Sequence, residues 1–240
     1  MQLPVDLRKD PLTVLHALGG YYECPKSPTG ERLGPLVGYA GTYDVGDGRR
    51  LQYVGDVYAN FAQAEQHPEV YGTWAARMGD QLQQSGVTVF MGMPMGGILV
   101  AQAMARVMGV RVIYPEKMIT ALKTATSREQ SKLVLNRHTL EPSDRVIIAE
   151  DVTNNFSTTA EALNLIRVSG AMPLAIASFF NRSPVREYAE LPVISLVFRT
   201  LPEYRQDDEA VVRDIATGNV KWKPKDQEAW PALMEAMCRK

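Results

Sequence analysis

Two adjacent acidic residues, Glu150 and Asp151, follow a short apolar run and precede a polar loop that opens a predicted helix. Ligands of open α/β sheets collect at the carboxyl ends of the strands, and the N–H groups at a helix N-terminus attract anions. Four hydroxyl side chains add hydrogen-bond donors to the same region: Thr153, Ser157, Thr158 and Thr159. The pattern fits a phosphorylated sugar, with the phosphate on the loop and the acids on its hydroxyls or on a divalent metal ion that it carries.

A second candidate loop contains Met95, Gly96 and Gly97, between a predicted strand at 87–93 and a predicted helix at 97–108. Glycines at such a point let the backbone approach a ligand closely. Both loops also have simpler interpretations. A glycine pair often makes only a tight turn, and the acidic pair fits a solvated strand end that is followed by a serine helix cap.

Strands that alternate with helices position both loops. Short β-branched runs predict strands at 87–93, 110–114, 145–149, 174–180 and 193–198, and apolar spacing predicts helices at 97–108 and 158–169. This alternation predicts right-handed βαβ crossovers and a parallel sheet that helices cover on both faces. The polar segment 115–143 interrupts the rhythm and is longer than most connections, which favours a functional flap or lid.

The first third of the chain differs from this regular part. The sequence predicts a short helix at residues 5–18. Residues 21–64 are rich in Gly, Tyr and Pro, a composition that is typical of short antiparallel strands joined by turns. A further helix is predicted at 68–84. We therefore expect one structural domain with three parts: an N-terminal helix and β-rich hood (1–86), an α/β core (87–200) and a C-terminal extension (201–240).

Composition excludes several classes of protein. The 240 residues carry 26 basic and 27 acidic side chains, a net charge of −1, which argues against a broad basic surface for nucleic acids. The chain has two cysteines and three scattered histidines, so no disulfide framework or His-ligated metal is indicated. No apolar run reaches the length of a membrane span, and the first residues do not form a secretory signal. We expect a cytoplasmic protein without a membrane or nucleic-acid partner.

The segment 146–171 resembles the ribose-phosphate-binding signature of type I phosphoribosyltransferases, in which an apolar strand and two acids lead into a Thr/Gly-rich loop and a helix. The resemblance implies the family's fold, a parallel sheet flanked by helices with a β-rich hood, and assigns ribose hydroxyls to Glu150 and Asp151. It places the 5-phosphate of phosphoribosyl pyrophosphate (PRPP) on six loop residues: Thr153, Asn154, Asn155, Phe156, Ser157 and Thr158. The loop Met95-Gly96-Gly97 is similar to the one that holds the pyrophosphate.

Other residues resemble those of one branch of the family, the orotate phosphoribosyltransferases. Arg182 stands where that branch carries an arginine that meets the carboxylate of orotate, although a surface arginine in a turn fits equally. Lys26 lies in a segment similar to the base-binding hood. Lys117 falls where the family has a cation that contacts pyrophosphate, and with Glu150 and Asp151 it completes the predicted catalytic set.

Two departures from the family pattern keep alternatives open. The chain has Asn154-Asn155-Phe156-Ser157 where the family usually has glycines, and phenylalanine does not tolerate the positive φ that a phosphate loop often needs. The flap lacks the family's His-Gly pair, so Lys123, Arg128, Lys132 or Arg137 would have to supply its charge.

The resemblance implies a phosphoribosyltransferase that moves ribose 5-phosphate from PRPP to orotate or a related carboxylate-bearing base, within pyrimidine biosynthesis. It also implies Mg²⁺ carried by PRPP without direct protein ligands, and a homodimer. The alternatives are a PRPP- or nucleotide-binding regulator with the same fold, and a phosphoribosyltransferase for another base. In the transferase for orotate or a related base, the acids would act through charge and geometry and would need no perturbed pKa.

Overall fold

The computed structural model describes residues 3, 5–121 and 130–238, which contacts divide into two compact units. The first unit combines residues 1–5, 12–63 and 201–240, and the second combines residues 6–11 and 64–200. These units differ from the predicted division at residues 86 and 200. The helix expected at 68–84 packs with the α/β core, and the C-terminal forty residues join the β-rich part.

The second unit contains the predicted parallel sheet, which confirms the α/β fold class. Its strand order is β11-β12-β10-β9-β5-β6, and every neighbouring pair is parallel except the edge pair β11–β12. The strands are β5 (Val89–Gly92), β6 (Arg111–Ile113), β9 (Arg145–Thr153), β10 (Met172–Asn181), β11 (Glu187–Tyr188) and β12 (Leu191–Phe198). Buried apolar residues make up β5 and most of the middle of β9 and β10, because helices cover the sheet on both faces.

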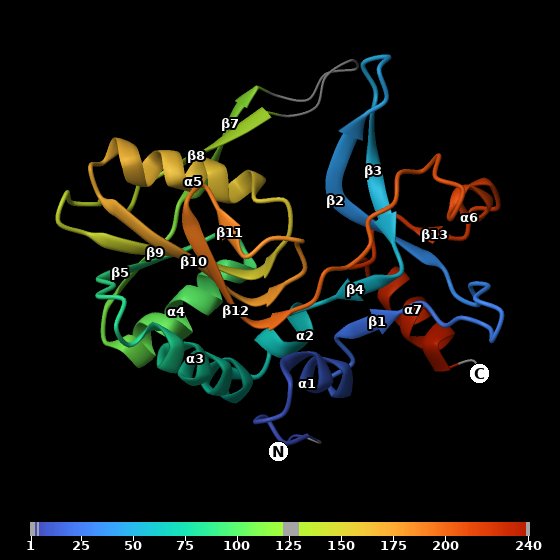
Figure 1. The fold of residues 1–240 in the computed structure, drawn as a ribbon, viewed down its shortest axis with the longest axis horizontal. Helices are drawn as coiled ribbons and strands as arrows, with labels where there is room; N and C mark the ends of the chain where they lie inside the picture. Colours follow the sequence, from blue (N-terminus) through green and yellow to red (C-terminus); the bar gives the residue numbers. More distant parts are fainter. Residues whose placement is uncertain (1–2, 4, 122–129, 239–240) are drawn as a thin grey trace. The chain divides into compact units, whose positions relative to one another are not determined.

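Three helices cover this sheet, as Figure 1 shows: α5 on one face, α3 and α4 on the other. They are α3 (Pro68–Leu82), α4 (Gly96–Met108) and α5 (Ser157–Val168), each amphipathic with its apolar side on the strands. Gly109, in the left-handed conformation (φ 68°), ends α4 where the sequence turns into β6. In the described part of the chain, no helix has the length and apolar character to cross a membrane.

The predicted flap is a β-hairpin in its described part. Strand β7 (Glu116–Ala121) pairs antiparallel with β8 (Gln130–Val134), and Lys117 lies opposite Leu133. The backbone N–H of Leu133 donates to the carboxylate of Glu161 on α5 (3.1 Å), and the Leu133 side chain is buried. The base of the hairpin is therefore fixed to the second unit.

The first unit is β-rich, as predicted, and is assembled from both ends of the chain. Strand β13 pairs parallel with β2, and β2 pairs antiparallel with β3. Its strands are β1 (Tyr21–Glu23), β2 (Leu36–Asp44), β3 (Arg50–Gly55), β4 (Val57–Ala59) and β13 (Val220–Lys221). The short helices outside the sheet-covering set are α1 (Pro11–Ala17), α2 (Ala62–Glu65), α6 (Val212–Ala216) and α7 (Ala229–Cys238).

A buried ion-pair cluster joins separate segments of the first unit. The carboxylate of Asp56 accepts from Arg32 (2.5 Å) and Lys26 (3.0 Å), and Arg32 also bonds Asp214 (3.2 Å). Burial raises the pKa of Asp56, but the hydrogen bonds and charges of Arg32 and Lys26 outweigh this effect and hold the pKa below its usual value. The cluster therefore needs Asp56 ionised.

We expect the stability of the first unit to fall in acid through Asp56. Because its pKa is lower in the folded chain, its contribution is complete above the unfolded value of about 4 and is lost as the pH falls through the folded value. Asp56→Asn should lower the free energy of unfolding at pH 7 by about 3 kcal/mol and flatten this acid slope. Urea unfolding at a series of pH values measures both. Asp47→Asn, which alters an exposed pair with Arg49, is the control and should change the free energy of unfolding little. The prediction would be contradicted if the wild type, Asp56→Asn and Asp47→Asn lost stability equally steeply as the pH falls.

Candidate functional site

The two acids lie inside the central strand β9, which continues to Thr153 instead of ending at Ala149 as predicted. β9 lies between β10 and β5, and Glu150 is opposite Ser178 of β10. Pairing with β10 continues to Thr153, and this keeps the polar end of β9 extended. Glu150 and Asp151 are neighbours in an extended strand, so their side chains leave it in opposite directions.

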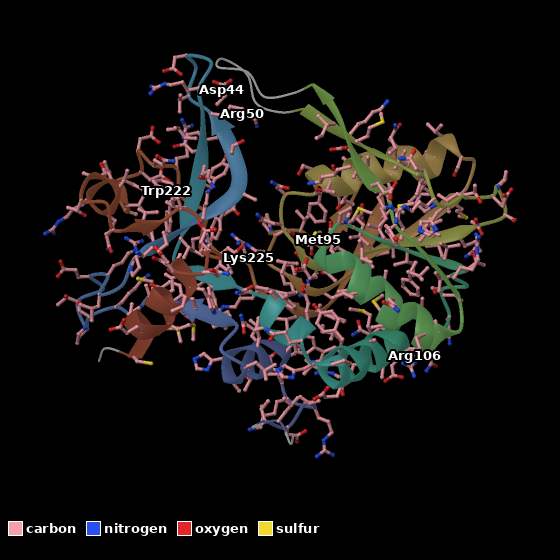
Figure 2. The ribbon with its side chains drawn as sticks, turned by 180° about the vertical axis from the view of Figure 1, so that it is seen from behind. Asp44, Arg50, Met95, Arg106, Trp222 and Lys225 are labelled. Atoms are coloured by element: carbon pink, nitrogen blue, oxygen red, sulfur yellow. The ribbon has the colours of Figure 1, made fainter. Side chains whose placement is uncertain are left out.

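Gly96 and Gly97 bring the start of α4 against β9. A Cβ atom on Gly96 would lie 2.5 Å from the carboxylate of Asp151, and one on Gly97 would overlap the carbonyl oxygen of Ala149. Only glycines permit this approach, so the pair has more than a turn-forming role. Met95, which is labelled in Figure 2, lies before the helix and is 84% exposed. Its peptide bond with Pro94 is cis.

The loop after β9 encloses a cavity of about 160 Å³. Its lining contains all six residues that the sequence predicts for a phosphate, together with Glu150, Val152 and Thr159. The N–H groups in the first turn of α5 have no partners within the helix, and the helix dipole adds partial positive charge there. The cavity thus joins an anion-attracting loop to one of the acids.

Several hydroxyl groups of this loop hold the loop itself together. The Thr153 hydroxyl shares a buried hydrogen bond with Ser178 (2.9 Å), and the Ser157 hydroxyl donates to the side chain of Asn155 (3.0 Å). Thr159 is buried. The sequence predicts that these hydroxyls add donors for a ligand, and the structure shows that Thr153 and Ser157 also shape the loop.

Phe156 occupies the left-handed conformation (φ 56°) immediately before α5. The sequence predicts that phenylalanine avoids such a position, and this prediction is wrong. A left-handed non-glycine residue costs about 1–2 kcal/mol, but the Phe156 side chain is buried against Ile176 and Val193. Its ring also stacks on Tyr188 at 4.5 Å between centroids with 9° between the planes. Burial and stacking offset the backbone strain that glycine would avoid.

We expect Tyr188→Leu to loosen the loop, because leucine keeps an apolar side chain at this place but removes the stacked ring. The free energy of unfolding should fall by about 1 kcal/mol, and any ligand that the loop holds through backbone N–H groups should bind more weakly. Urea unfolding and inorganic phosphate titration measure these effects. Tyr188→Phe keeps the ring and is the matched control; leucine and phenylalanine variants with identical behaviour would contradict a role for stacking.

The electrostatics of the acidic pair depend on burial. Burial raises the pKa of Glu150 well above its usual value, the Asp151 carboxylate raises it further, and the Lys117 ammonium lowers it. The role predicted for the acids needs no perturbed pKa, yet burial in the folded chain raises that of Glu150. Lys117, on β7 of the hairpin, therefore carries its ammonium group within electrostatic range of Glu150.

The other predicted cations lie in different surroundings. Arg182 follows β10, donates its backbone N–H to Thr153 (3.0 Å) and is 8% exposed, so it is not a surface arginine. Lys26 belongs to the first unit, where it pairs with Asp56. In the hairpin, Arg137 pairs with Glu116 (2.7 Å). The side chain of Lys132 is exposed, and Lys123 and Arg128 lie outside the described residues.

Sequence reasoning missed Ser178 and Tyr188. Ser178 interrupts an otherwise apolar strand, and a polar residue in a buried strand is a signal that could have identified it. Tyr188 lies 32 positions after Phe156 in a two-residue edge strand, and no local pattern connects the two rings. Long-range stacking of this kind appears only in the folded chain.

Curated proteins with similar sequences are orotate phosphoribosyltransferases. The chain is 29% identical to that of Desulforamulus reducens over 127 residues, which are 52% of this chain and 61% of the relative. It is 32% identical to that of Heliobacterium modesticaldum over 52% of this chain and 62% of the relative. It is 24% identical to that of Caldanaerobacter subterraneus over 64% of this chain and 75% of the relative. The first of these matches thus spans about three fifths of the relative, and no family model matches the chain.

Solved structures show the fold. Adenine phosphoribosyl transferase of Trypanosoma brucei aligns with a TM-score of 0.52 and 17% identity over 82% of each chain. UMP synthase of Leishmania donovani aligns with a TM-score of 0.51 and 12% identity over 98% of this chain and 42% of that one. The chain therefore has the type I phosphoribosyltransferase fold, and its sequence is related to the orotate phosphoribosyltransferases.

Proposed function

We propose that this chain, with its type I phosphoribosyltransferase fold and its sequence relationship to orotate phosphoribosyltransferases, transfers ribose 5-phosphate from PRPP to a nucleobase and releases pyrophosphate. The favoured acceptor is orotate or a related base with a carboxylate. One observation carries the proposal: the acids of β9, the Gly96-Gly97 start of α4 and the cavity of the loop before α5 meet at the carboxyl ends of adjacent strands.

Each part of this site has a role in the proposed reaction. The loop cavity and the first turn of α5 bind the 5-phosphate. The Gly96-Gly97 backbone and Lys117 hold the pyrophosphate that leaves. Glu150 and Asp151 bind the ribose hydroxyls and stabilise the positive charge that grows on the sugar as the bond to pyrophosphate breaks. A ring nitrogen of the base then attacks C1 of the ribose.

We propose that Mg²⁺ enters the site bound to PRPP. Carboxylate oxygens are ligands that Mg²⁺ prefers, so Glu150 and Asp151 suit a metal–sugar complex. When bound, the ion neutralises charge on the leaving pyrophosphate.

Arg182 is the proposed carboxylate-binding residue for the base. Its guanidinium can form a bidentate pair with a carboxylate, and its backbone N–H is bonded to Thr153 at the end of β9. This link places the backbone of Arg182 next to the start of the proposed phosphate loop. The contact of Lys26 with the base stays a prediction, as does the homodimer, which light scattering tests directly.

Two observations favour a second candidate, a regulator that binds PRPP or a nucleotide without rapid transfer. The loop has Phe156 where the family usually has glycine, and the sequence of the flap has no His-Gly pair. A third candidate is transfer to another base, such as adenine, the substrate named for the Trypanosoma brucei neighbour.

One experiment separates these candidates: the protein is incubated with Mg²⁺, PRPP and a panel of bases, and pyrophosphate release is followed. Release with orotate supports the proposal. Pyrophosphate release with adenine but not with orotate would identify adenine as the acceptor. PRPP binding without pyrophosphate release in the presence of any base would support the regulator. Absence of both PRPP binding and release overturns the whole assignment.

We expect an acid limb in the pH dependence of kcat/KM for PRPP. Ribose hydroxyls donate to an ionised carboxylate, and burial raises the pKa of Glu150. Activity should therefore fall as the pH decreases through a value above the usual 4.5 of a glutamate. In Glu150→Gln this limb should disappear, with lower activity at neutral pH. The steady-state rate measured across a pH series tests this, and an unchanged limb in the variant would assign it to another group.

A further inference from the structure

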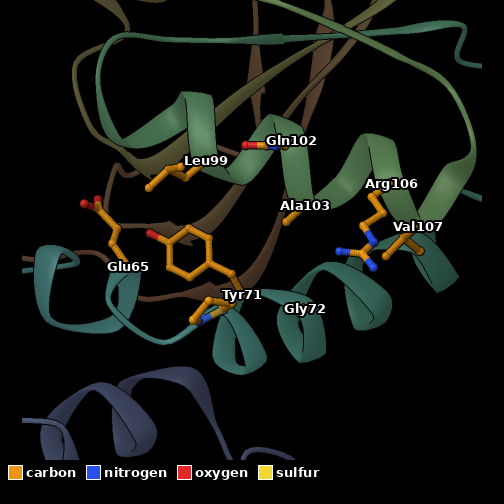
Figure 3. Close-up of a pocket in the computed structure, with 9 residues that line it drawn as sticks. Glu65, Tyr71, Gly72, Leu99, Gln102, Ala103, Arg106 and Val107 are labelled. Carbon is orange, nitrogen blue, oxygen red and sulfur yellow. The ribbon is translucent and has the colours of Figure 1, made fainter.

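The second unit contains a groove outside the proposed transfer site. It has a volume of about 520 Å³ and lies between α3 and α4, with α2 at one end (Figure 3). Cavities of this size commonly hold small molecules. Its lining is Glu65, Pro68, Tyr71, Gly72, Leu99, Gln102, Ala103, Arg106 and Val107.

The apolar part of the groove comes mainly from one side of α4. Leu99, Ala103 and Val107 recur every four residues and therefore share a face of the helix. Leu99 is 40% exposed and Val107 is 46% exposed, so this face is not covered within the chain. Across the groove, Gly72 leaves open space, because a Cβ atom there would meet no atom within 4 Å.

Tyr71 places a polar atom at the end of this apolar surface. The side chain is 5% exposed, and its hydroxyl makes no hydrogen bond with any described residue. The ring is held by Phe179 at 5.1 Å and by Trp74 at 6.1 Å, and Figure 3 shows the hydroxyl between Leu99 and Glu65. A buried hydroxyl without a partner carries a desolvation cost that a ligand can remove.

The charges at the two ends of the groove differ. Burial raises the pKa of the Tyr71 hydroxyl, and the carboxylates of Asp151 and Glu65 raise it further, so the hydroxyl stays a hydrogen-bond donor. Near the other end, Arg106 is exposed and forms no ion pair with the described residues. Seven residues of helix separate Leu99 from Arg106, a rise of about 10 Å.

We propose that this groove binds a small organic anion with a flat apolar body, an anionic group that pairs with Arg106, and a neutral acceptor that receives the Tyr71 hydroxyl. The apolar body covers Leu99 and Ala103. Glu65 beside Tyr71 excludes a second negative group at that end. The Asp151 carboxylate lies within electrostatic range of Tyr71, but the groove lies outside the loop cavity, and its ligand takes no part in the proposed transfer reaction.

Dansylglycine is a suitable probe, because it combines a naphthalene body, sulfonamide oxygens and a carboxylate, and its fluorescence rises in apolar surroundings. We expect saturable binding of one equivalent. Arg106→Gln should weaken dansylglycine about fivefold, as expected for one exposed ion pair, without affecting dansylamide, which lacks the carboxylate. Arg167→Gln, at an exposed arginine in the last turn of α5, is the matched control and should leave both affinities unchanged.

Two further variants test the apolar surface of the groove at Ala103 and the hydroxyl of Tyr71. Ala103→Phe fills the groove and should abolish binding. Tyr71→Phe should weaken binding about fivefold while the melting temperature stays equal to or above that of the wild type, because the lost hydroxyl has no hydrogen-bond partner among the residues that the structure describes. Equal binding in all variants overturns the proposal, as does a large fall in melting temperature for Tyr71→Phe. A wild-type dimer that Ala103→Phe converts to a monomer also overturns it, since a second copy would then occupy the groove.

Discussion

Asp151→Asn is expected to lower kcat for phosphoribosyl transfer by about two orders of magnitude, the typical loss of one preorganised electrostatic group. The amide keeps the size of the side chain but not its charge, and positive charge develops on the ribose in the transition state. Asp151 is fixed for this role, because one of its oxygens accepts from the N–H of Val152 (2.9 Å) and Gly96 packs against it. Pyrophosphate release under saturating PRPP and base measures the change.

Asp144→Asn is the control for this substitution. Asp144 precedes β9 at its opposite end, where it pairs with Arg111 (2.6 Å), so its loss should lower stability without changing kcat per folded molecule. Turnover of Asp151→Asn within twofold of the wild type would remove the carboxylate from the mechanism. Loss of turnover in both variants to the same extent would instead indicate damage to β9.

Gly97→Ala is expected to have the largest structural effect at the site. The new methyl group would overlap the carbonyl oxygen of Ala149, a backbone atom of a central strand that cannot rotate away. The free energy of unfolding should fall by about 3 kcal/mol, and KM for PRPP should rise at least about tenfold, since α4 must move away from the acids. Urea unfolding and steady-state kinetics measure the two effects.

Gly72→Ala provides the comparison for Gly97→Ala. Gly72 lies in α3 with open space at the Cβ position, so alanine should stabilise the helix by up to about 1 kcal/mol. Gly96→Ala should reduce activity more than it lowers the free energy of unfolding, because its methyl group would meet the Asp151 carboxylate rather than a backbone atom. A Gly97→Ala protein as stable and as active as Gly72→Ala would contradict the proposed close approach.

The α/β core could be predicted from the sequence because its signals are local. The apolar runs of β5 and β9 and the spacing of α4 and α5 each lie within a dozen residues, and the structure has them within a few residues of the predicted bounds. The extension of β9 to Thr153 could not be predicted. Its polar residues stay extended because they pair with β10, which is distant in the sequence.

Long-range contacts also explain the other differences. The left-handed Phe156 depends on Tyr188, and neither residue alone indicates the stack. The C-terminal segment was expected to be an extension of a single domain. In the structure it belongs to the first unit, where β13 pairs with β2, which precedes it by about 180 positions. The positions of the candidate acids and glycines were predictable from residue types, whereas the raised pKa of Glu150 depends on burial in the folded protein.

The division of the chain between the two units has a consequence during translation. Residues 64–200 of the second unit are continuous and leave the ribosome before the strand and helix that complete the first unit. The β13 partner of β2 is therefore absent until late in synthesis. The apolar residues of α7 that bury Tyr22 and Val37 are absent until then as well. Since domains generally fold as they are synthesised, the α/β core should form on the ribosome while the β-rich unit closes only after residue 233 has emerged.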